Sequence, residues 1–359
     1  MGSRQDFEKG EVVSAAGEIY FIGEKDLRTK EITSYYKVGI VRENLENADR
    51  SSTQRLLEHQ TGNPRELYIE SIVKSDLVEL VETLLHKNFA PLGVRGEWML
   101  LNASQLKEVQ ERAEQLATEA KEITADLNKA DELSKVVSSD ELIPSTPELV
   151  ALNEMYLESN AKLKACNEML DAIKEIFAEA LEDEDEEEEV GIFAQIQERQ
   201  KSVFDEEAFK SAHSAIYAKF VVTKTTVKGT PSFAGSRGFK KEFKDFDPGF
   251  ASMVDGFATI VEKIQLGEEK KEYLHGFSLE LRRVNAEAIW SKMRAESKMK
   301  VACGRHAGID GLLKWVRTEK VTESLDKKAL KQSHPELVAE FTTAGEVVKA
   351  VIVDPKKGY

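Results

Sequence analysis

The sequence predicts a mixed α+β protein that is built from more than one structural unit. Its first hundred residues alternate short β-type runs with helical patterns, and its middle part has the heptad patterns of extended helices. The last part again mixes helical and β-type segments. A chain of 359 residues exceeds one ordinary compact domain, so we expect two or three units.

The expected first unit, residues 1–102, contains three β-type runs. Glu18–Ile22 and Tyr35–Val41 are separated by the polar stretch Glu24–Ser34, which predicts a hairpin with a long loop. Leu67–Val73 alternates between apolar and polar residues and is expected to form the third strand. These runs together predict a small, antiparallel three-stranded sheet.

Two helical patterns flank these strands. Gln54–His59 ends at the helix-breaking sequence Thr-Gly-Asn-Pro. Leu77–Phe89 carries an apolar stripe at helical spacing, which begins at Leu77 and includes Leu85. A stripe of this kind has to be buried, so we expect this second helix to pack on the sheet.

Residues 103–181 have apolar residues at alternating intervals of three and four, which is the pattern of a coiled-coil seam. A Pro-containing breaker at Ser138–Pro147 divides the pattern into two parts of similar length. This arrangement predicts an antiparallel helical hairpin within the chain, but a dimerising coiled coil would have the same pattern. The seam positions are Leu106, Val109, Ala113, Leu116, Ala120, Ile123, Leu127, Ala130, Leu149, Leu152, Tyr156, Ser159, Leu163, Cys166, Leu170, Ile173, Phe177 and Ala180.

Charge is distributed unevenly along the chain, whose net charge is −15. Residues 103–190 have 8 Lys and Arg against 25 Asp and Glu, whereas residues 191–359 have 29 against 23. The unbroken acidic run Glu182–Glu189 predicts a solvated linker, residues 182–190, before a C-terminal unit at 191–359. That C-terminal unit can therefore face phosphates although the whole chain is acidic.

The C-terminal unit contains an internal repeat with a constant offset of 121 residues. The sequence FDEEAFKSAHSAIYAKF at Phe204–Phe220 matches LDKKALKQSHPELVAEF at Leu325–Phe341. Each copy has an Asp that suits a helix N-cap, and each leads into a β-type segment. We expect equivalent helix–strand units at 204–227 and 325–348, within an α+β recognition domain.

Cysteine content and hydropathy bear on the cellular compartment. The chain has two cysteines, Cys166 and Cys303, too few for a zinc finger or a disulfide framework, which suits a reducing cytoplasm. No apolar run reaches the roughly 18 residues of a membrane span, and the N-terminus lacks the apolar core of a signal peptide. We therefore expect a cytoplasmic protein that has no membrane partner.

Four motifs follow one another in the first unit. They are GEIYFIG at Gly17–Gly23, YYKVGIV at Tyr35–Val41, RLLEHQTGNP at Arg55–Pro64 and ETLLHKNFAPLGVRGEWM at Glu82–Met99. Their order and chemistry resemble the GIY-YIG endonuclease superfamily, specifically its phage-type branch, in which the second signature reads Lys-Val-Gly or Lys-Ile-Gly. The resemblance covers about residues 15–102 and implies phosphodiester hydrolysis.

The resemblance implies roles for three residues in the reaction itself. Tyr20 matches the tyrosine that lies near the attacking water in this superfamily. Arg55 matches the arginine that contacts the scissile phosphate, a task that suits a forked guanidinium. Glu82 matches the single carboxylate that binds Mg²⁺ or Mn²⁺, and one carboxylate suffices because Mg²⁺ keeps several waters.

Three further residues are expected to support catalysis. His59 lies four residues after Arg55, so the two share a helix face, and it can assist proton transfer or bind phosphate. Lys37 stands where many relatives have the second tyrosine, and could hold phosphate or lower the pKa of the phenol. His86, one turn beyond Glu82, matches a histidine that is typical of the phage-type branch.

Some positions depart from the pattern or carry two interpretations. The stretch between the first two signatures is longer than in compact members. The late asparagine of the superfamily has no clear counterpart, although Asn88 and Asn102 are candidates. Trp98 is expected in the core, whereas Glu97 either orients a catalytic side chain or is a surface carboxylate.

Substrate choice is expected to depend on the C-terminal unit. There Arg237, Lys240, Lys241 and Lys244 are interleaved with phenylalanines, a pattern that suits a nucleic-acid surface. Lysine-rich segments also occur simply as solvated surface, so both interpretations stay open at this point.

The sequence as a whole predicts a metal-dependent endonuclease that cuts DNA, of phage, mobile-element or defence type. The alternative is a non-catalytic nucleic-acid- or protein-binding scaffold that retains the nuclease fold. The presence of Tyr20, Arg55, His59 and Glu82 together favours the enzyme. A homodimer through the heptad region would bring two catalytic units together.

Overall fold

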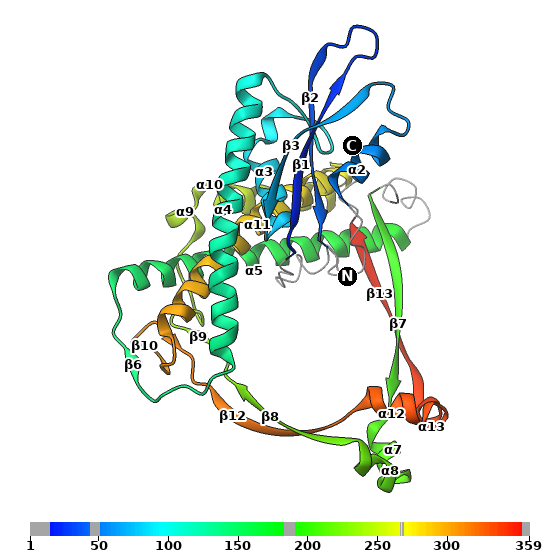
Figure 1. Cartoon of the computed structure of the whole chain (residues 1–359), viewed down its shortest axis with the longest axis vertical. Helices are drawn as coiled ribbons and strands as arrows, with labels where there is room; N and C mark the ends of the chain where they lie inside the picture. Colours follow the sequence, from blue (N-terminus) through cyan, green and yellow to red (C-terminus); the bar gives the residue numbers. More distant parts are fainter. Residues whose placement is uncertain are drawn as a thin grey trace.

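The computed structural model describes residues 15–43, 51–182, 191, 193–265, 267 and 269–353. Helices account for 54% and strands for 26%, which confirms the α+β class. An N-terminal sheet lies beside two long helices, and two β-ribbons lead from the helical body to a small four-helix unit (Figure 1). No helix in the described part combines the length and apolar character that crossing a membrane requires.

The N-terminal sheet has five antiparallel strands in the order β3-β1-β2-β5-β4. The three predicted strands are present, and two short strands extend the sheet around the Gly-Glu-Trp turn. The strands are β1 (Gly17–Lys25), β2 (Ile32–Arg42), β3 (Glu66–Ser75), β4 (Gly93–Arg95) and β5 (Trp98–Leu100).

β1 and β2 continue beyond their predicted ends, so the expected long loop is a short turn. Strand pairing extends to Lys25 and Ile32. Within the turn, the Asp26 carboxylate accepts hydrogen bonds from the backbone N–H groups of Arg28 at 2.8 Å and Thr29 at 2.9 Å. The prediction was wrong because charged strand ends and Asx-turn residues have the same polar composition as a loop.

Helices cover both faces of this sheet. Along β1, Ile19 and Phe21 enter the large core with α3 (Val78–Asn88), whereas Tyr20 and Ile22 face α2 (Ser52–Gln60). This division follows from the alternation of side chains along a strand. The η1 turn (Ala90–Leu92) then leads from α3 to β4.

The heptad segments form α4 (Ala103–Ser134) and α5 (Pro147–Glu182). α4 begins with a capping box, in which Asn102 and Gln105 each satisfy a backbone N–H group of the other. Its apolar seam joins the core of the sheet unit, and that core also contains residues of α11 (Glu272–Cys303). Asn102 thus has a structural task that accounts for its presence.

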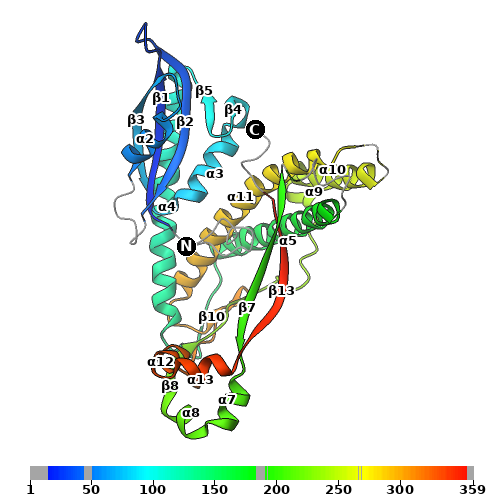
Figure 2. The ribbon, with the colours of Figure 1, turned by 90° about the vertical axis from the view of Figure 1, so that its right-hand side faces the viewer.

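α4 and α5 differ from the predicted antiparallel pair, because they cross rather than run alongside each other (Figure 1). The seam of α5 instead packs along α11, which lies beside it (Figure 2). An apolar seam specifies that a partner helix is needed but not which one. α10 (Pro248–Gln265) and the short α9 (Phe243–Phe246) complete this helical body.

A small four-stranded sheet closes the far end of the helical body. Its strands, in the order β6-β10-β11-β9, are two residues long each. They are β6 (Leu142–Ile143), β9 (Ser232–Phe233), β10 (Gly308–Ile309) and β11 (Leu313–Lys314). The predicted linker at 182–190 lies outside the described residues, apart from Glu182 at the end of α5.

The two copies of the repeat have the same order of strand, two helices and strand. Asp205 and Asp326 each cap their first helix, accepting from the backbone N–H three residues later at 2.9 Å. The first copy comprises β7 (Ala194–Phe204), α7 (Glu206–Ala212), α8 (Ser214–Phe220) and β8 (Val221–Lys228). The second comprises β12 (Thr318–Leu325), α12 (Lys327–Ser333), α13 (Pro335–Glu340) and β13 (Thr342–Val353).

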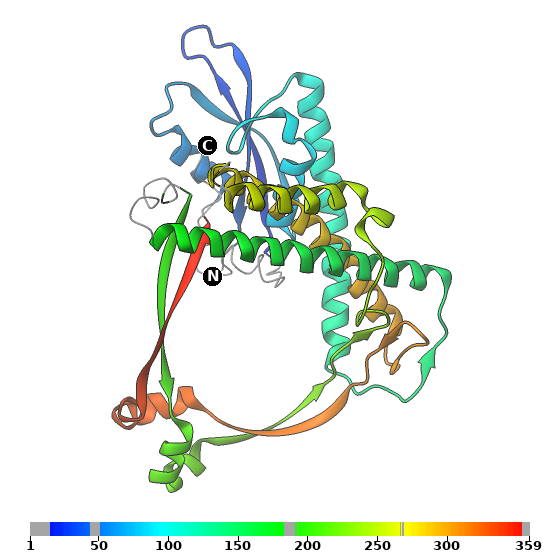
Figure 3. The same ribbon diagram turned by 180° about the vertical axis from the view of Figure 1, so that it is seen from behind.

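The copies are joined reciprocally. The Asp205 N–H donates to the Phe341 carbonyl at 2.9 Å, and the Asp326 N–H donates to the Phe220 carbonyl at 2.8 Å. β7 pairs with β13, and β8 pairs with β12, so each antiparallel ribbon takes one strand from each copy (Figure 3). The β7/β13 ribbon shifts its register between Ala344 and Val347, whereas the β8/β12 ribbon has no such shift.

Candidate active site

Tyr20 lies on the face of the sheet that α2 covers. In the strand register Tyr20 stands opposite Gly39 of β2. The phenol is 1% exposed, and its hydroxyl oxygen lies 3.2 Å from Nε2 of His59. The fold thus brings these two predicted catalytic residues into hydrogen-bond contact.

Gly39 provides the space that Tyr20 occupies. A Cβ atom at position 39 would lie 2.5 Å from the phenol oxygen and 2.7 Å from Cζ of the ring. Contacts of this length are far inside van der Waals distance. The glycine of the Lys-Val-Gly motif is therefore required by the neighbouring strand's tyrosine.

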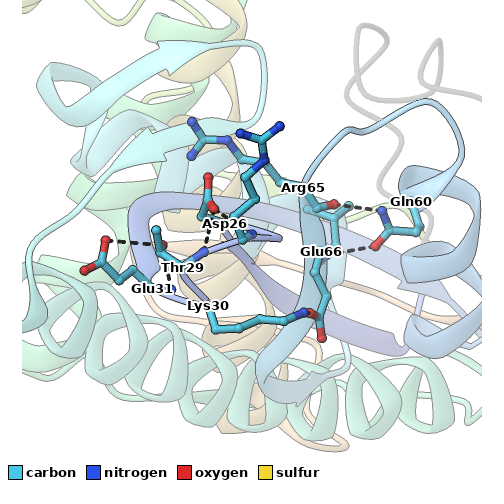
Figure 4. A network of polar contacts seen from close by, with 9 residues as sticks. Asp26, Thr29, Lys30, Glu31, Gln60, Arg65 and Glu66 are labelled. Carbon is cyan, nitrogen blue, oxygen red and sulfur yellow. Dashed lines mark hydrogen bonds and ion pairs between the residues drawn. The ribbon is translucent and has the colours of Figure 1, made fainter.

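Polar contacts hold α2 against the sheet. The helix buries little apolar surface, since Ser52 is its one buried residue. At its start, Oγ of Ser52 donates to Oε2 of Glu18 at 2.6 Å. At its end, the Gln60 amide donates to the Arg65 carbonyl and accepts from the Leu67 N–H, both at 2.8 Å. Figure 4 shows the Gln60 contacts together with those of the β1–β2 turn. Both ends of the helix are thus fastened to the sheet.

The charges around Tyr20 set the protonation of the site. Burial, followed by the negative charge of Glu97, raises the pKa of Tyr20 to about 12, while Arg55 acts in the opposite direction. Burial, followed by the positive charges of Lys37 and Arg55, lowers the pKa of His59. At neutral pH a protonated phenol therefore faces a neutral imidazole, which can accept its proton.

Arg55 shares the α2 face of His59, as its spacing predicts. Its guanidinium forms an ion pair with Glu58 of the same helix, and its side chain is 23% exposed. The pair involves one part-exposed carboxylate, so it is weak and can be exchanged for a phosphate. Arg55 also hydrogen-bonds the side chain of Tyr20, so its guanidinium connects Glu58 of α2 with the phenol of β1.

Lys37 lies next to this group but is held by a protein carboxylate. Its ammonium forms an ion pair with Glu97, and the residue is 8% exposed. Glu97 is itself positioned by the turn between β4 and β5, where its carbonyl accepts the Val38 N–H at 3.0 Å. This arrangement favours a positioning role for the pair over direct phosphate binding by Lys37.

α3 brings Glu82 and His86 to the adjoining edge of β2. β5 stops pairing with β2 at Lys37, and the carbonyl of the next residue, Val38, lies 3.1 Å from Nε2 of His86. His86 thus closes the strand edge, and burial lowers its pKa. Glu82 is half-buried one turn earlier, and its charge contributes to the raised pKa of Tyr20.

The donor set of this corner suits one kind of metal ion. Within the described residues there is no group of three or more His, Cys, Asp or Glu side chains that could hold a metal. A zinc site needs such a group, whereas Mg²⁺ accepts one or two carboxylates and retains water. Glu82 is a single carboxylate of the kind that Mg²⁺ accepts.

The four predicted nucleic-acid-binding residues lie on a different part of the molecule, in and just before α9. Lys241 pairs with Glu158 of α5 at 2.7 Å, and Lys244 pairs with Glu242 at 2.5 Å. Arg237 and Lys240 are exposed. The phenylalanines among them are buried or half-buried: they are Phe233, Phe239, Phe243 and Phe246. The expected interleaved surface is thus reduced to two cations.

The sequence analysis does not identify the residues that hold α2 against the sheet. Gln60 and the contact between Ser52 and Glu18 have no motif that would mark them. The only available signal was the position of Gln60 directly before the Thr-Gly-Asn-Pro breaker. Trp98 packs beside Tyr20 and Ile22, as expected for a core residue.

Comparison with known families bears on this arrangement. Residues 17–114 match the T5orf172 domain. This is a phage-associated domain in the family of GIY-YIG and homing-endonuclease-like nucleases. The match begins at β1 and ends within α4, so it includes the first part of that helix. No curated protein and no solved structure matches the chain.

Proposed function

We propose that the T5orf172 domain of this protein is a metal-dependent endonuclease that hydrolyses phosphodiester bonds in DNA. The observation that carries the proposal is the contact between Tyr20 and a neutral His59, at 3.2 Å. A buried phenol beside an imidazole that can take its proton is a proton-transfer pair. Arg55 on the same helix face adds the cation that phosphate chemistry needs.

The pair activates water in two coupled transfers. His59 accepts the phenolic proton of Tyr20, and Tyr20 accepts a proton from the attacking water. The high pKa of the buried phenol makes the phenolate a strong base during this transfer. The low pKa of His59 keeps its nitrogen free of a proton before the step.

Arg55 and Glu82 complete the site on the phosphate side. The Arg55 fork binds the non-bridging oxygens of the scissile phosphate, replacing its contact with Glu58. Glu82 is the residue that would hold Mg²⁺, which supplies neutralisation of the charge that develops at phosphorus. The ion pair of Lys37 and Glu97 fixes the charges that face the phenol.

A nuclease assay with the full chain tests this function. Plasmid, linear duplex, single-stranded and branched DNA are incubated with Mg²⁺, with Mn²⁺ or with chelator. We expect cutting that requires the metal ion. The rate should fall at least a hundredfold in Glu82→Ala, because this variant lacks the carboxylate that would hold the ion. The matched control is Glu79→Ala, which removes a carboxylate from the preceding turn of α3 that pairs with Arg42.

Equal loss of cutting in Glu79→Ala and Glu82→Ala would mean that the helix was disturbed rather than the metal site. Absence of cutting on every substrate, with binding intact in the wild-type protein and in Glu82→Ala, would contradict the proposal. That result would favour the non-catalytic scaffold instead.

A further inference from the structure

The β8/β12 ribbon is an isolated two-stranded element. Apart from Leu325 at its end, it has no extensive packing against a described helix, and both of its faces are largely exposed. At the body end, Nε1 of Trp315 donates to the Gly229 carbonyl at 3.2 Å. At the other end, Leu325 enters the core of the four-helix unit. A two-stranded ribbon is barely stable alone in water, so these two anchors hold it.

The two faces of this ribbon differ sharply in chemistry. Directly paired residues of an antiparallel ribbon lie on the same face, and every second pair alternates. We call one face the lysine face; it has three lysines, four hydroxyl residues, one valine and no acid. It consists of Val222, Lys224, Thr226, Lys228, Thr318, Lys320, Thr322 and Ser324.

The opposite face has no cation. Its pairs include the carboxylates of Glu319 and Glu323 and the exposed side chain of Val321. The cations of this ribbon are therefore segregated to one side rather than mixed with acids, as on an ordinary solvated surface. In a chain with a net charge of −15, such segregation requires a reason.

The three lysines are also unneutralised. Among the residues that the structure describes, none forms an ion pair with Lys224, Lys228 or Lys320, whereas Lys241 and Lys244 of the α9 region are both paired. All three side chains are exposed. Three free ammonium groups among hydroxyls form a surface that is complementary to a row of phosphates.

We propose that the lysine face of the β8/β12 ribbon binds duplex DNA. A two-stranded β-ribbon fits the major groove, and hydroxyl and ammonium groups contact the phosphates that border it. The face carries no aromatic residue, which argues against single strands, because these are held mainly by stacking. The ribbon spans about 26 Å at about 3.3 Å per residue, enough for several consecutive phosphates.

The ribbon is physically connected to the T5orf172 domain. Beyond the end of α4, the Ser138 N–H donates to the Arg317 carbonyl at 3.0 Å, and the Arg317 N–H donates to Oγ of Ser138 at 3.0 Å. Arg317 directly precedes β12. The ribbon base therefore lies near the C-terminal end of α4, whereas the N-terminal sheet packs along the first part of the same helix, where the Gln110 amide donates to Oγ of Ser71 at 2.7 Å.

This inference rests on the proposed function for its biological meaning, but its test does not need cutting. Binding of a fluorescent 30-base-pair duplex and of a single strand of equal length is measured with the full chain in chelator, at several salt concentrations. The test variant is Lys224→Gln/Lys228→Gln/Lys320→Gln. The matched control, Arg199→Gln/Lys201→Gln/Lys349→Gln, removes the same charge from the β7/β13 ribbon. A thermal melt confirms that both variants fold.

We expect the test variant to bind duplex at least tenfold more weakly than wild type and than the control. The slope of log affinity against log salt should become shallower by about 3, one for each lost phosphate contact. Unchanged duplex binding, equal loss in both variants, or equal loss for single strands would each overturn the inference. If the ribbon variant binds normally while Glu82→Ala stops cutting, the proposed function stands without the ribbon. If no substrate is cut but duplex binding requires the three lysines, the ribbon is a DNA-binding surface and the proposed nuclease function fails.

Discussion

Gly39 and Tyr20 face each other across β1 and β2 so closely that a Cβ atom on Gly39 would lie 2.5 Å from the phenol oxygen. The glycine is therefore part of the seat of the tyrosine, and the hydroxyl reaches His59 only because position 39 has no side chain. The glycine of the Lys-Val-Gly motif and the position of the Tyr20 hydroxyl therefore depend on each other.

Replacing Gly39 by Ala should displace the Tyr20 ring and separate its hydroxyl from His59. We expect the free energy of unfolding to fall by about 1–3 kcal/mol from overpacking, with a larger proportional loss of cutting. Gly256→Ala serves as control, because a Cβ there meets no atom within 4 Å. If Gly39→Ala retained full cutting, the close contact would have no catalytic meaning.

Tyr20→Phe tests the hydroxyl alone. The ring and its packing stay, so the melting temperature should change little, because the lost hydrogen bond has a net value of about 1 kcal/mol. Cutting should fall by about a hundredfold or more, the usual effect of removing a proton-transfer group. Duplex binding in chelator should be unaltered. Wild-type cutting by Tyr20→Phe would exclude the phenol from proton transfer.

The pH dependence of cutting should report His59. Its pKa lies below the ordinary value of 6.5, because of burial and then the charges of Lys37 and Arg55. In the proposed mechanism the imidazole accepts a proton in its neutral form, so the rate should rise with pH through a midpoint below 6.5 and then level off. Its charged and titratable neighbours are Tyr20, Lys37, Arg55, Glu58 and Glu97. A midpoint clearly above about 7 would contradict this assignment, and His59→Gln should remove the acidic limb.

The ion pair of Lys37 and Glu97 should show coupling in a double-mutant cycle. Glu97→Gln leaves a covered ammonium without its partner and should cost more stability than the same change at exposed Glu319. Lys37→Met in addition should recover part of that loss, with a coupling energy of about 0.5–3 kcal/mol. Chemical denaturation of the four proteins measures it. Strict additivity would show that the two side chains do not depend on each other.

The repeat predicts matched effects at two distant positions. Asp205→Ala and Asp326→Ala each remove an N-cap contact of 2.9 Å, so each should cost about 1 kcal/mol of stability. Cutting of a short duplex should be unaffected by both. Very unequal losses in thermal melts would indicate that the copies do not have equivalent structural tasks.

Much of the N-terminal domain could be predicted from its sequence, for reasons that particular residues illustrate. β1 and β2 are predictable because strands with two buried faces have short apolar runs, β3 is predictable because Leu67–Val73 alternates, and Tyr20 and Gly39 are predictable because of their motifs. β4 and β5 escaped because three-residue strands have no period to detect. The contacts of Gln60 escaped because a side-chain amide that holds a loop has no characteristic spacing.

The long-range arrangement could not be predicted in the same way. The apolar seams of α4 and α5 are recognisable in the sequence, but a seam does not identify its partner helix, and α11 begins only at Glu272, far beyond the end of α5 at Glu182. The lysine face was invisible for a related reason. Lys224 and Lys320 are almost a hundred residues apart, and only the strand register places them together.

The register shift between Ala344 and Val347 makes the β7/β13 ribbon differ from the β8/β12 ribbon, although the two ribbons are built from the same repeat. Arg199 and Lys349 stand at the positions equivalent to Lys320 and Lys228 in the other copy, 121 residues away. A slip of one residue turns every following side chain to the other side, so Lys349 pairs with Glu198 while Arg199 pairs with Val348. In a dimer of identical chains, any change in one copy of the repeat would also be present in the other copy. Because both copies lie in one chain, a one-residue shift in strand register has dispersed the cations of one ribbon and left those of the other aligned.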